Sequence, residues 1–130
     1  MLLMTAGLGS TGATFADPCT APLPAAGKAF NGTVRYVGDG DGLCVGRSTD
    51  PATWIEVRIA DFYAPELHEP GGEEAKRSLA KLALGREARC VAGRRSYDRT
   101  IARCSIQGRD IGDELRRIGG SEGGRGWRSR

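Results

Sequence analysis

A stretch of alternating apolar and polar residues, 54–60, constrains the fold of this chain more than any other feature. Side chains at every second position of a strand point to the same face, so the alternation predicts a strand with one buried face. Arg58 lies on the opposite face. Pro65 follows soon after the strand and favours its end because it lacks a backbone N–H, and the carboxylate of Glu66 comes next. The apolar positions are Ile55, Val57 and Ile59.

Further strand and helix signals surround this stretch. Four more segments have the composition of strands, and two segments carry apolar residues at helical spacing. Three strands, a helix, two strands and a helix is the order of a five-stranded barrel of the oligonucleotide-binding (OB) type, so we predict a mostly β, α+β fold. The predicted strands cover 28–37, 43–45, 54–60, 88–92 and 101–106, and the predicted helices cover 73–84 and 110–118.

The chain of 130 residues fits one domain with a moderate core. Its net charge is +3, and the concentration of basic residues toward the C-terminus mildly favours an anionic partner, although a charge run is more often a solvated face. We divide it into a Pro- and Ala-rich extended arm at 17–27, a barrel domain at 28–119 and a basic, Gly- and Arg-rich tail at 120–130. No segment after residue 16 is apolar for long enough to span a membrane, and we expect a monomer.

Residues 1–16 carry no charge and consist mostly of small and apolar residues. Small side chains at Thr14 and Ala16 suit cleavage by a signal peptidase after Ala16. We interpret this segment as the remnant of a secretory signal, which predicts an exported protein, either periplasmic or secreted. An N-terminal tail without a targeting role is the alternative.

The four cysteines support export, because disulfides persist in oxidising compartments and no pair has the C-x-x-C spacing of metal sites. Cys90 and Cys104 lie on two strands that should form a hairpin, so a bond between them is geometrically reasonable. Cys19 and Cys44 would then join the arm to the barrel. This pairing is one of three that four cysteines allow, and buried free thiols are a further alternative.

Three charged residues near strand ends suggest phosphate chemistry. The guanidinium groups of Arg58 and Arg99 match phosphate oxygens and stay charged at any relevant pH. Glu66 is a candidate general base that could take a proton from water, and a surface salt bridge is its alternative role. Together these residues imply attack of water on a phosphodiester.

Asp39 and Asp41 carry hard oxygen atoms on either side of a glycine and could bind a divalent cation. The same Asp-Gly-Asp-Gly sequence is also common in hairpin turns for backbone reasons. A cation beside two arginines would stabilise the charge that develops at phosphorus. The single histidine, His68, and the lack of a Ser-His pairing argue against a triad hydrolase.

Five motifs, taken together and in order, resemble the staphylococcal-nuclease-like, or thermonuclease, domain family over about residues 30–119. The motifs are V-G-D-G-D-G-L, V-R-I-A-D-F-Y-A-P-E, G-E-E-A-K-R-S-L-A-K-L, Y-D-R-T-I-A-R and G-R-D-I-G-D-E-L-R-R-I-G. The resemblance implies an OB barrel with packed helices. It also implies calcium-dependent cleavage of DNA and RNA to products that end in a 3′-phosphate.

Carried over residue by residue, the resemblance implies a role for each matching position. Arg58 and Arg99 look like the two phosphate-binding arginines, and Glu66 looks like the general base. Asp41 looks like a calcium-ligand aspartate, and Tyr97 resembles the tyrosine beside the nucleotide phosphate.

The chain departs from the family pattern where a second calcium-binding aspartate is expected, because Tyr63 stands there. A phenol is a poor calcium ligand beside a carboxylate. Asp61 lies two positions earlier, on the same face of an extended chain, where it would partly compensate. Gly42 replaces the usual threonine after the second aspartate, and Asp98 replaces the usual glycine before the arginine.

We therefore predict an exported nuclease that acts on DNA, RNA or both, with Ca²⁺ as its cofactor and a weakened metal site. A nucleic-acid-binding barrel without turnover is the first alternative, since the basic residues would still contact phosphates. A disulfide-stapled structural or protein-binding domain is the second, because a fold does not fix a function.

Overall fold

The computed structural model describes residues 17–120 and 122–123. The signal segment predicted at 1–16 lies outside the described residues, as does nearly all of the predicted tail. The arm at 17–27 has no helix and no regular strand until its last residues turn into the barrel, in agreement with its proline-rich composition.

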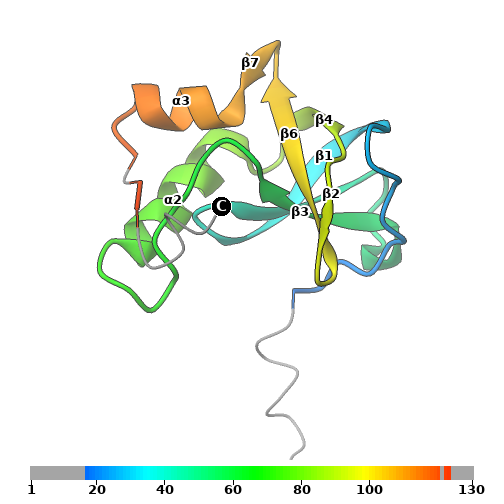
Figure 1. Cartoon of the computed structure of the whole chain (residues 1–130), viewed down its shortest axis with the longest axis horizontal. Helices are drawn as coiled ribbons and strands as arrows, with labels where there is room; N and C mark the ends of the chain where they lie inside the picture. Colours follow the sequence, from blue (N-terminus) through cyan, green and yellow to red (C-terminus); the bar gives the residue numbers. More distant parts are fainter. Residues whose placement is uncertain (1–16, 121, 124–130) are drawn as a thin grey trace, which may run out of the picture.

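Five strands close into a barrel (Figure 1). β1 (Ala29–Asp39) pairs antiparallel with β2 (Gly42–Gly46), and β2 pairs antiparallel with β3 (Trp54–Ile59). β3 runs parallel to β6 (Arg99–Ile106). The ring closes through β4 (Glu87–Val91), which pairs antiparallel with both β6 and β1. This closed barrel with two helices confirms an α+β, OB-like fold.

The predicted order of three strands, helix, two strands and helix is not confirmed, because short elements interrupt it. A 3-10 helix (Pro51–Thr53) precedes β3, and its N-cap Asp50 accepts a hydrogen bond from Ala52. Two-residue strands, β5 (Arg95–Ser96) and β7 (Arg109–Asp110), flank β6 and pair with its two ends. Such short strands carry too few residues for alternation to reveal them.

Two helices cover one side of the barrel, opposite the arm (Figure 1). α2 (Gly72–Ala83) follows Gly71, whose φ of 86° is left-handed, and its buried residues recur at helical spacing. α3 (Ile111–Arg117) packs against α2 and the end of β6. The apolar side chains that bind α2 to the barrel are Ala75, Leu79 and Ala83.

The core confirms the alternation from which the fold was predicted. Val57 and Ile59 of β3 are fully buried, whereas Arg58 between them is partly exposed. Apolar side chains from every barrel strand and both helices join them in one cluster. Because side chains alternate, the polar residues of β3 lie on the outer face of the barrel.

Both predicted disulfides are present. Cys90 and Cys104 are direct cross-strand partners in β4 and β6, with Cα atoms 4.0 Å apart. Cys19 and Cys44 join the arm to the outer face of β2. Disulfides of this kind fit an exported protein. Among the described residues, no helix has the length and apolar character needed to cross a bilayer.

Candidate active site

The register between β3 and β6 brings charged residues together on the outer face of the barrel. Val57 is the partner of Thr100, and Arg58 is the partner of Ile101. Since Val57 and Thr100 point into the barrel, the flanking residues Glu56, Arg58 and Arg99 point outward. Two strands that are about 40 residues apart in the sequence thus place both predicted arginines on one surface.

Arg58 and Asp41 form an ion pair, with Nη2 3.8 Å from Oδ2. The Arg58 side chain is only 18% exposed, and its Nε is buried with no hydrogen-bond partner among the described residues. Asp41 also accepts a hydrogen bond from the backbone N–H of Ala64, at 3.1 Å. The guanidinium is therefore held by a carboxylate on one side and keeps donors for a further acceptor.

Tyr63 is buried and lies beside this ion pair. The Arg58 guanidinium carbon is 5.7 Å from the centre of the Tyr63 ring, within the range of a cation–π contact. The ring therefore supports the arginine at the position where the family pattern has a carboxylate. A neutral ring leaves the local charge of the site less negative than an aspartate would.

The turn between β1 and β2 presents Asp39 and Asp41 close together. The Asp41 N–H donates to Asp39 Oδ1 at 3.2 Å, as in a tight turn. Gly40 between them is required by packing, because a Cβ there would lie 2.4 Å from Ala64 Cβ and 2.5 Å from Ala75 Cβ. Burial, and then the charge of Asp39, raise the pKa of Asp41 to about 6, although Ala64 and Arg58 oppose the rise.

A cavity of about 420 Å³, which we call the Arg99 cavity, opens beside this turn. It collects residues from the arm, β1, β3 and the turn before β6. Asp39, Tyr97 and Arg99 of the predicted site line it, as does Leu67, the neighbour of Glu66. The full lining is Asp17, Gly38, Asp39, Glu56, Leu67, Tyr97, Asp98 and Arg99.

Asp17 and Glu56 were not predicted as site residues. Glu56 is only 8% exposed, and it shares a hydrogen bond with Asp17. Burial raises the pKa of Glu56 to about 8, with further contributions from the hydrogen bond and charge of Asp17 and from Asp98, while Arg99 opposes the rise. Glu56 could have been found from the sequence, since it shares a strand face with Arg58. Asp17 reaches the site only because the arm is bonded to β2.

The structure leaves the Glu66 carboxylate without a described contact to Arg58 or Arg99. The Glu66 backbone N–H donates to Glu69 Oε1 at 2.8 Å, which fixes the chain in a turn between Pro65 and α2. Glu66 itself is partly exposed. Asp39 and Asp41 meet in the turn, and Asp41 pairs with Arg58, whereas no contact among the described residues joins the Glu66 carboxylate to them.

The structure directs Asp61 toward α3, so its prediction as a compensating cation ligand is not supported by its contacts. Asp61 Oδ2 is 3.9 Å from Arg103 Nη2, and a Cβ on Gly112 would lie 2.6 Å from the Asp61 carboxyl carbon. Burial raises the pKa of Asp61, and Arg103 and Arg116 partly offset the rise. An extended chain was expected here, but it turns directly after Ala60.

Within the described residues, no group of three or more His, Cys, Asp or Glu side chains is arranged to hold a metal ion. Asp39 and Asp41 remain as the two carboxylates that could supply oxygen ligands. Their mutual repulsion contributes to the raised pKa of Asp41, and a cation between them would relieve it. The donor set thus fits a cation bound by two protein side chains and completed by other oxygen atoms.

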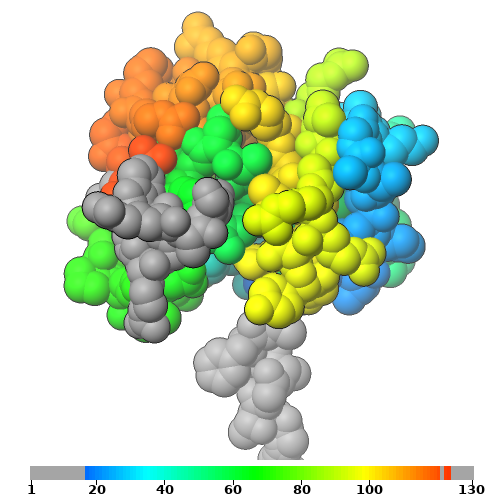
Figure 2. Space-filling view, viewed as in Figure 1, coloured from blue at the N-terminus to red at the C-terminus, as the bar shows by residue number. Residues whose placement is uncertain are grey.

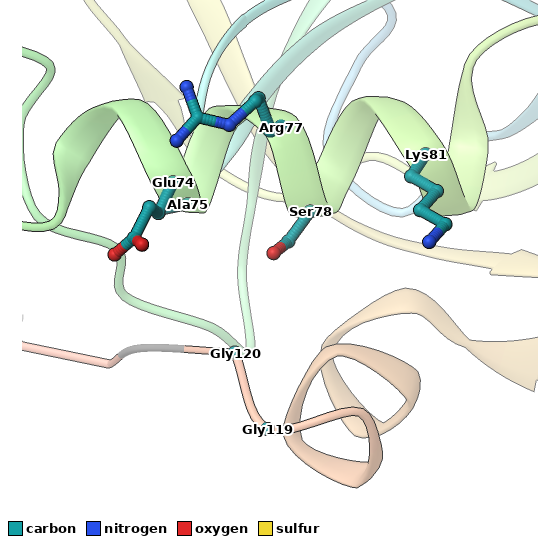
Figure 3. A pocket seen from close by; sticks show the side chains of 7 residues that line it. All are labelled: Glu74, Ala75, Arg77, Ser78, Lys81, Gly119 and Gly120. Atoms are coloured by element: carbon teal, nitrogen blue, oxygen red, sulfur yellow. The ribbon is translucent and has the colours of Figure 1, made fainter.

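Another cavity lies against α2 and contains none of the predicted site residues (Figure 3). Glu74, Ser78 and Lys81 extend from the helix on the side of Gly119 and Gly120. Its charges have both signs and no carboxylate pair accompanies them. Exposed side chains of α2 therefore lie apart from the predicted site and suit control substitutions.

In comparisons with known proteins, no family model matches this sequence, and no curated protein matches it either. The resemblance to thermonuclease domains consequently stays a hypothesis from sequence motifs.

Proposed function

We propose that this protein is an exported phosphodiesterase that hydrolyses DNA, RNA or both. One observation carries the proposal. The partly buried Arg58 is paired with Asp41 on the same outer face that carries Arg99. Two arginines and a pair of acidic turn residues have little value for the barrel core, but they match the charge of a phosphodiester.

In the proposed reaction, Arg58 and Arg99 bind the nonbridging oxygens of the phosphate. Their charge stabilises the phosphorane as negative charge accumulates, and a site held by Asp41 and Tyr63 needs little reorganisation. Glu66 takes a proton from the attacking water, whose oxygen bonds to phosphorus. The bond from phosphorus to the leaving sugar oxygen then breaks, and that oxygen takes a proton from solvent water. The turn at Glu66 must bring its carboxylate to the water when the substrate is bound.

Asp39 and Asp41 are the residues that would hold a Ca²⁺ ion, with water and phosphate oxygens completing its shell. Such an ion would supply further stabilisation of charge on the phosphate. The replacement of a carboxylate by Tyr63 predicts that its affinity is weak.

A nucleic-acid-binding barrel without turnover is the second candidate. It is favoured by the lack of a described contact between Glu66 and either arginine, and it would use the same phosphate contacts. A structural or protein-binding domain is the third, and only the disulfides and the closed barrel favour it.

Hydrolysis of plasmid and heat-denatured DNA, with and without Ca²⁺, tests the proposal. The Glu66→Gln variant should lose about 10²- to 10⁴-fold in kcat with little change in KM, as expected for a general base. Glu73→Gln, an exposed change on α2, is the matched control. Equal activity of Glu66→Gln and the parent protein would exclude the assigned role, and binding without hydrolysis would favour the second candidate.

A further inference from the structure

A second hollow, which we call the arm groove, lies between the N-terminal arm and the segment that connects β4 to β6. Its volume is about 220 Å³. Figure 2 shows the two walls in contact, with the connecting segment in yellow and the arm in blue. The arm contributes Leu23, Pro24, Ala25 and Ala26, and the connecting segment with β6 contributes Gly93, Arg94, Arg95 and Thr100.

Backbone hydrogen bonds hold the two walls together. The Gly27 N–H donates to the Ala92 carbonyl at 2.8 Å, and the Ala92 N–H donates to the Lys28 carbonyl at 2.8 Å. Closer to the N-terminus, the Ala21 N–H donates to the Trp54 carbonyl at 3.0 Å, and the Cys19–Cys44 disulfide joins the arm to β2. The groove therefore exists before any ligand binds, so a ligand does not bear the cost of ordering it.

The charge of the arm groove is entirely positive. Arg94 and Arg95 are exposed, and no carboxylate lines the groove with them. Neither arginine makes an ion pair with another described residue. Two arginines without a counter-ion favour an anion, and the planar form of each guanidinium group suits phosphate.

The groove and the Arg99 cavity lie on opposite sides of one short hairpin. Arg95 is the cross-strand partner of Thr100, and Ser96 is the partner of Arg99. Thr100, which lies on the inner face of β6, lines the groove, and Arg99, which lies on the outer face, lines the cavity. A ligand that occupies both must bend around the turn at Tyr97, whose side chain is 89% exposed.

We propose that the arm groove binds the backbone of a single-stranded nucleic acid whose neighbouring phosphates lie at the Arg99 cavity. This inference depends on the proposed function. A single strand can bend around the turn, whereas a duplex is stiff over about 150 base pairs. The exposed ring of Tyr97 offers a surface on which a base can stack at the bend. The apolar arm residues then contact the sugar or base of the strand.

Binding by fluorescence anisotropy tests the groove, with a labelled oligothymidylate about eight nucleotides long, within the span of one OB fold. The full chain carries Glu66→Gln so that the probe is not consumed. Adding Arg94→Ala and Arg95→Ala should weaken binding by about tenfold or more. It should also reduce the slope of log K against log salt by about 1.4, which corresponds to two single-strand phosphates.

Arg77→Ala with Lys81→Ala is the matched control, since it removes the same charge from exposed positions of α2. It should leave the salt slope of the single-strand probe unchanged. A hairpin duplex probe should lose much less affinity than the single strand in the groove variant. Equal losses for the groove variant and the control, or for the single strand and the duplex, would overturn the inference.

The outcomes also separate this inference from the proposed function. If the parent protein hydrolyses DNA but the groove variant binds as well as the control variant, the groove inference is wrong and the proposed function stands. Binding that depends on Arg94 and Arg95 in a parent protein without hydrolysis would overturn the phosphodiesterase and support the groove. Absence of oligothymidylate binding in the parent background would overturn the groove whatever the hydrolysis result.

Discussion

The Arg99 cavity and the arm groove share one hairpin but differ in charge. Four carboxylates, from Asp17, Asp39, Glu56 and Asp98, line the cavity with a single arginine. The groove has two arginines and no carboxylate. An anion entering the cavity therefore meets repulsion unless a proton or a cation neutralises part of the lining, whereas the groove attracts an anion directly. The proposed reaction at the cavity and the proposed backbone binding at the groove therefore make different demands on charge.

Among the changes that test this comparison, the largest expected effect comes from Arg58. Arg58→Lys keeps the charge but loses the planar fork that contacts two phosphate oxygens, so kcat should fall about 10²- to 10³-fold. The same substitution at Arg94, in the groove, should change kcat much less. Steady-state kinetics on single-stranded DNA would measure both, and similar losses at the two positions would break the proposed division between the Arg58 site on the outer face of β3 and the arm groove.

The two disulfides offer a second comparison. Replacing both cysteines of either pair by alanine should lower the free energy of unfolding by about 3 kcal/mol, because the bonds close loops with separations of 25 and 14 residues. Loss of the Cys19–Cys44 bond should also weaken single-strand binding, since it releases the arm wall of the groove. Urea titration and anisotropy would test this. Equal binding by the two double variants would show that the arm does not shape the groove.

Substitutions of Tyr63 test whether the turn at Asp39 and Asp41 can bind a cation. Tyr63→Asp should raise the affinity for Ca²⁺ by about tenfold or more, because a carboxylate is the better ligand beside Asp41. Tyr63→Asn also removes the ring from Arg58 but adds no charge, so it should bring little gain. Calorimetric titration would measure the affinities, and no gain with the aspartate would count against the location of the cation at Asp39 and Asp41.

The smallest effect concerns Glu56 and pH. The unfolded chain releases the Glu56 proton near the usual pKa of 4.5, while the folded chain keeps it to about 8. The folded state thus binds more protons in this window, so the free energy of unfolding should fall as pH rises from about 5 to 8. In Glu56→Gln, the free energy of unfolding should fall by about 1–2 kcal/mol less over this pH range than in the parent protein. The effect is this small because solvent in the open cavity screens the charge of Glu56.

Thermal unfolding of the parent protein and of Glu56→Gln between pH 5 and pH 9 would measure the effect. Glu73→Gln, which removes an exposed carboxylate from α2, is the control and should follow the parent protein. Parallel curves for Glu56→Gln and the parent protein would mean that the cavity does not hold Glu56 in its neutral form.

Much of the fold could be predicted because its signals are local. The alternation in β3 and the helical spacing of Ala75, Leu79 and Ala83 both depend on neighbouring residues. The short strands β5 and β7 were missed, since two residues show no period. Asp61 was placed with Asp41 on the assumption of an extended chain, but the chain turns after β3 and directs that carboxylate to α3.

The sequence by itself determined the barrel strands, the two helices and the candidates Arg58, Arg99, Asp39 and Asp41, because each depends on residue type and local spacing. Only the tertiary structure decided which of them meet. The parallel register of β3 and β6 placed the two arginines on one outer face, and the Cys19–Cys44 bond joined the arm to the barrel. That bond closes a long loop, so no local pattern could reveal Asp17 beside Glu56 or the groove beneath the arm.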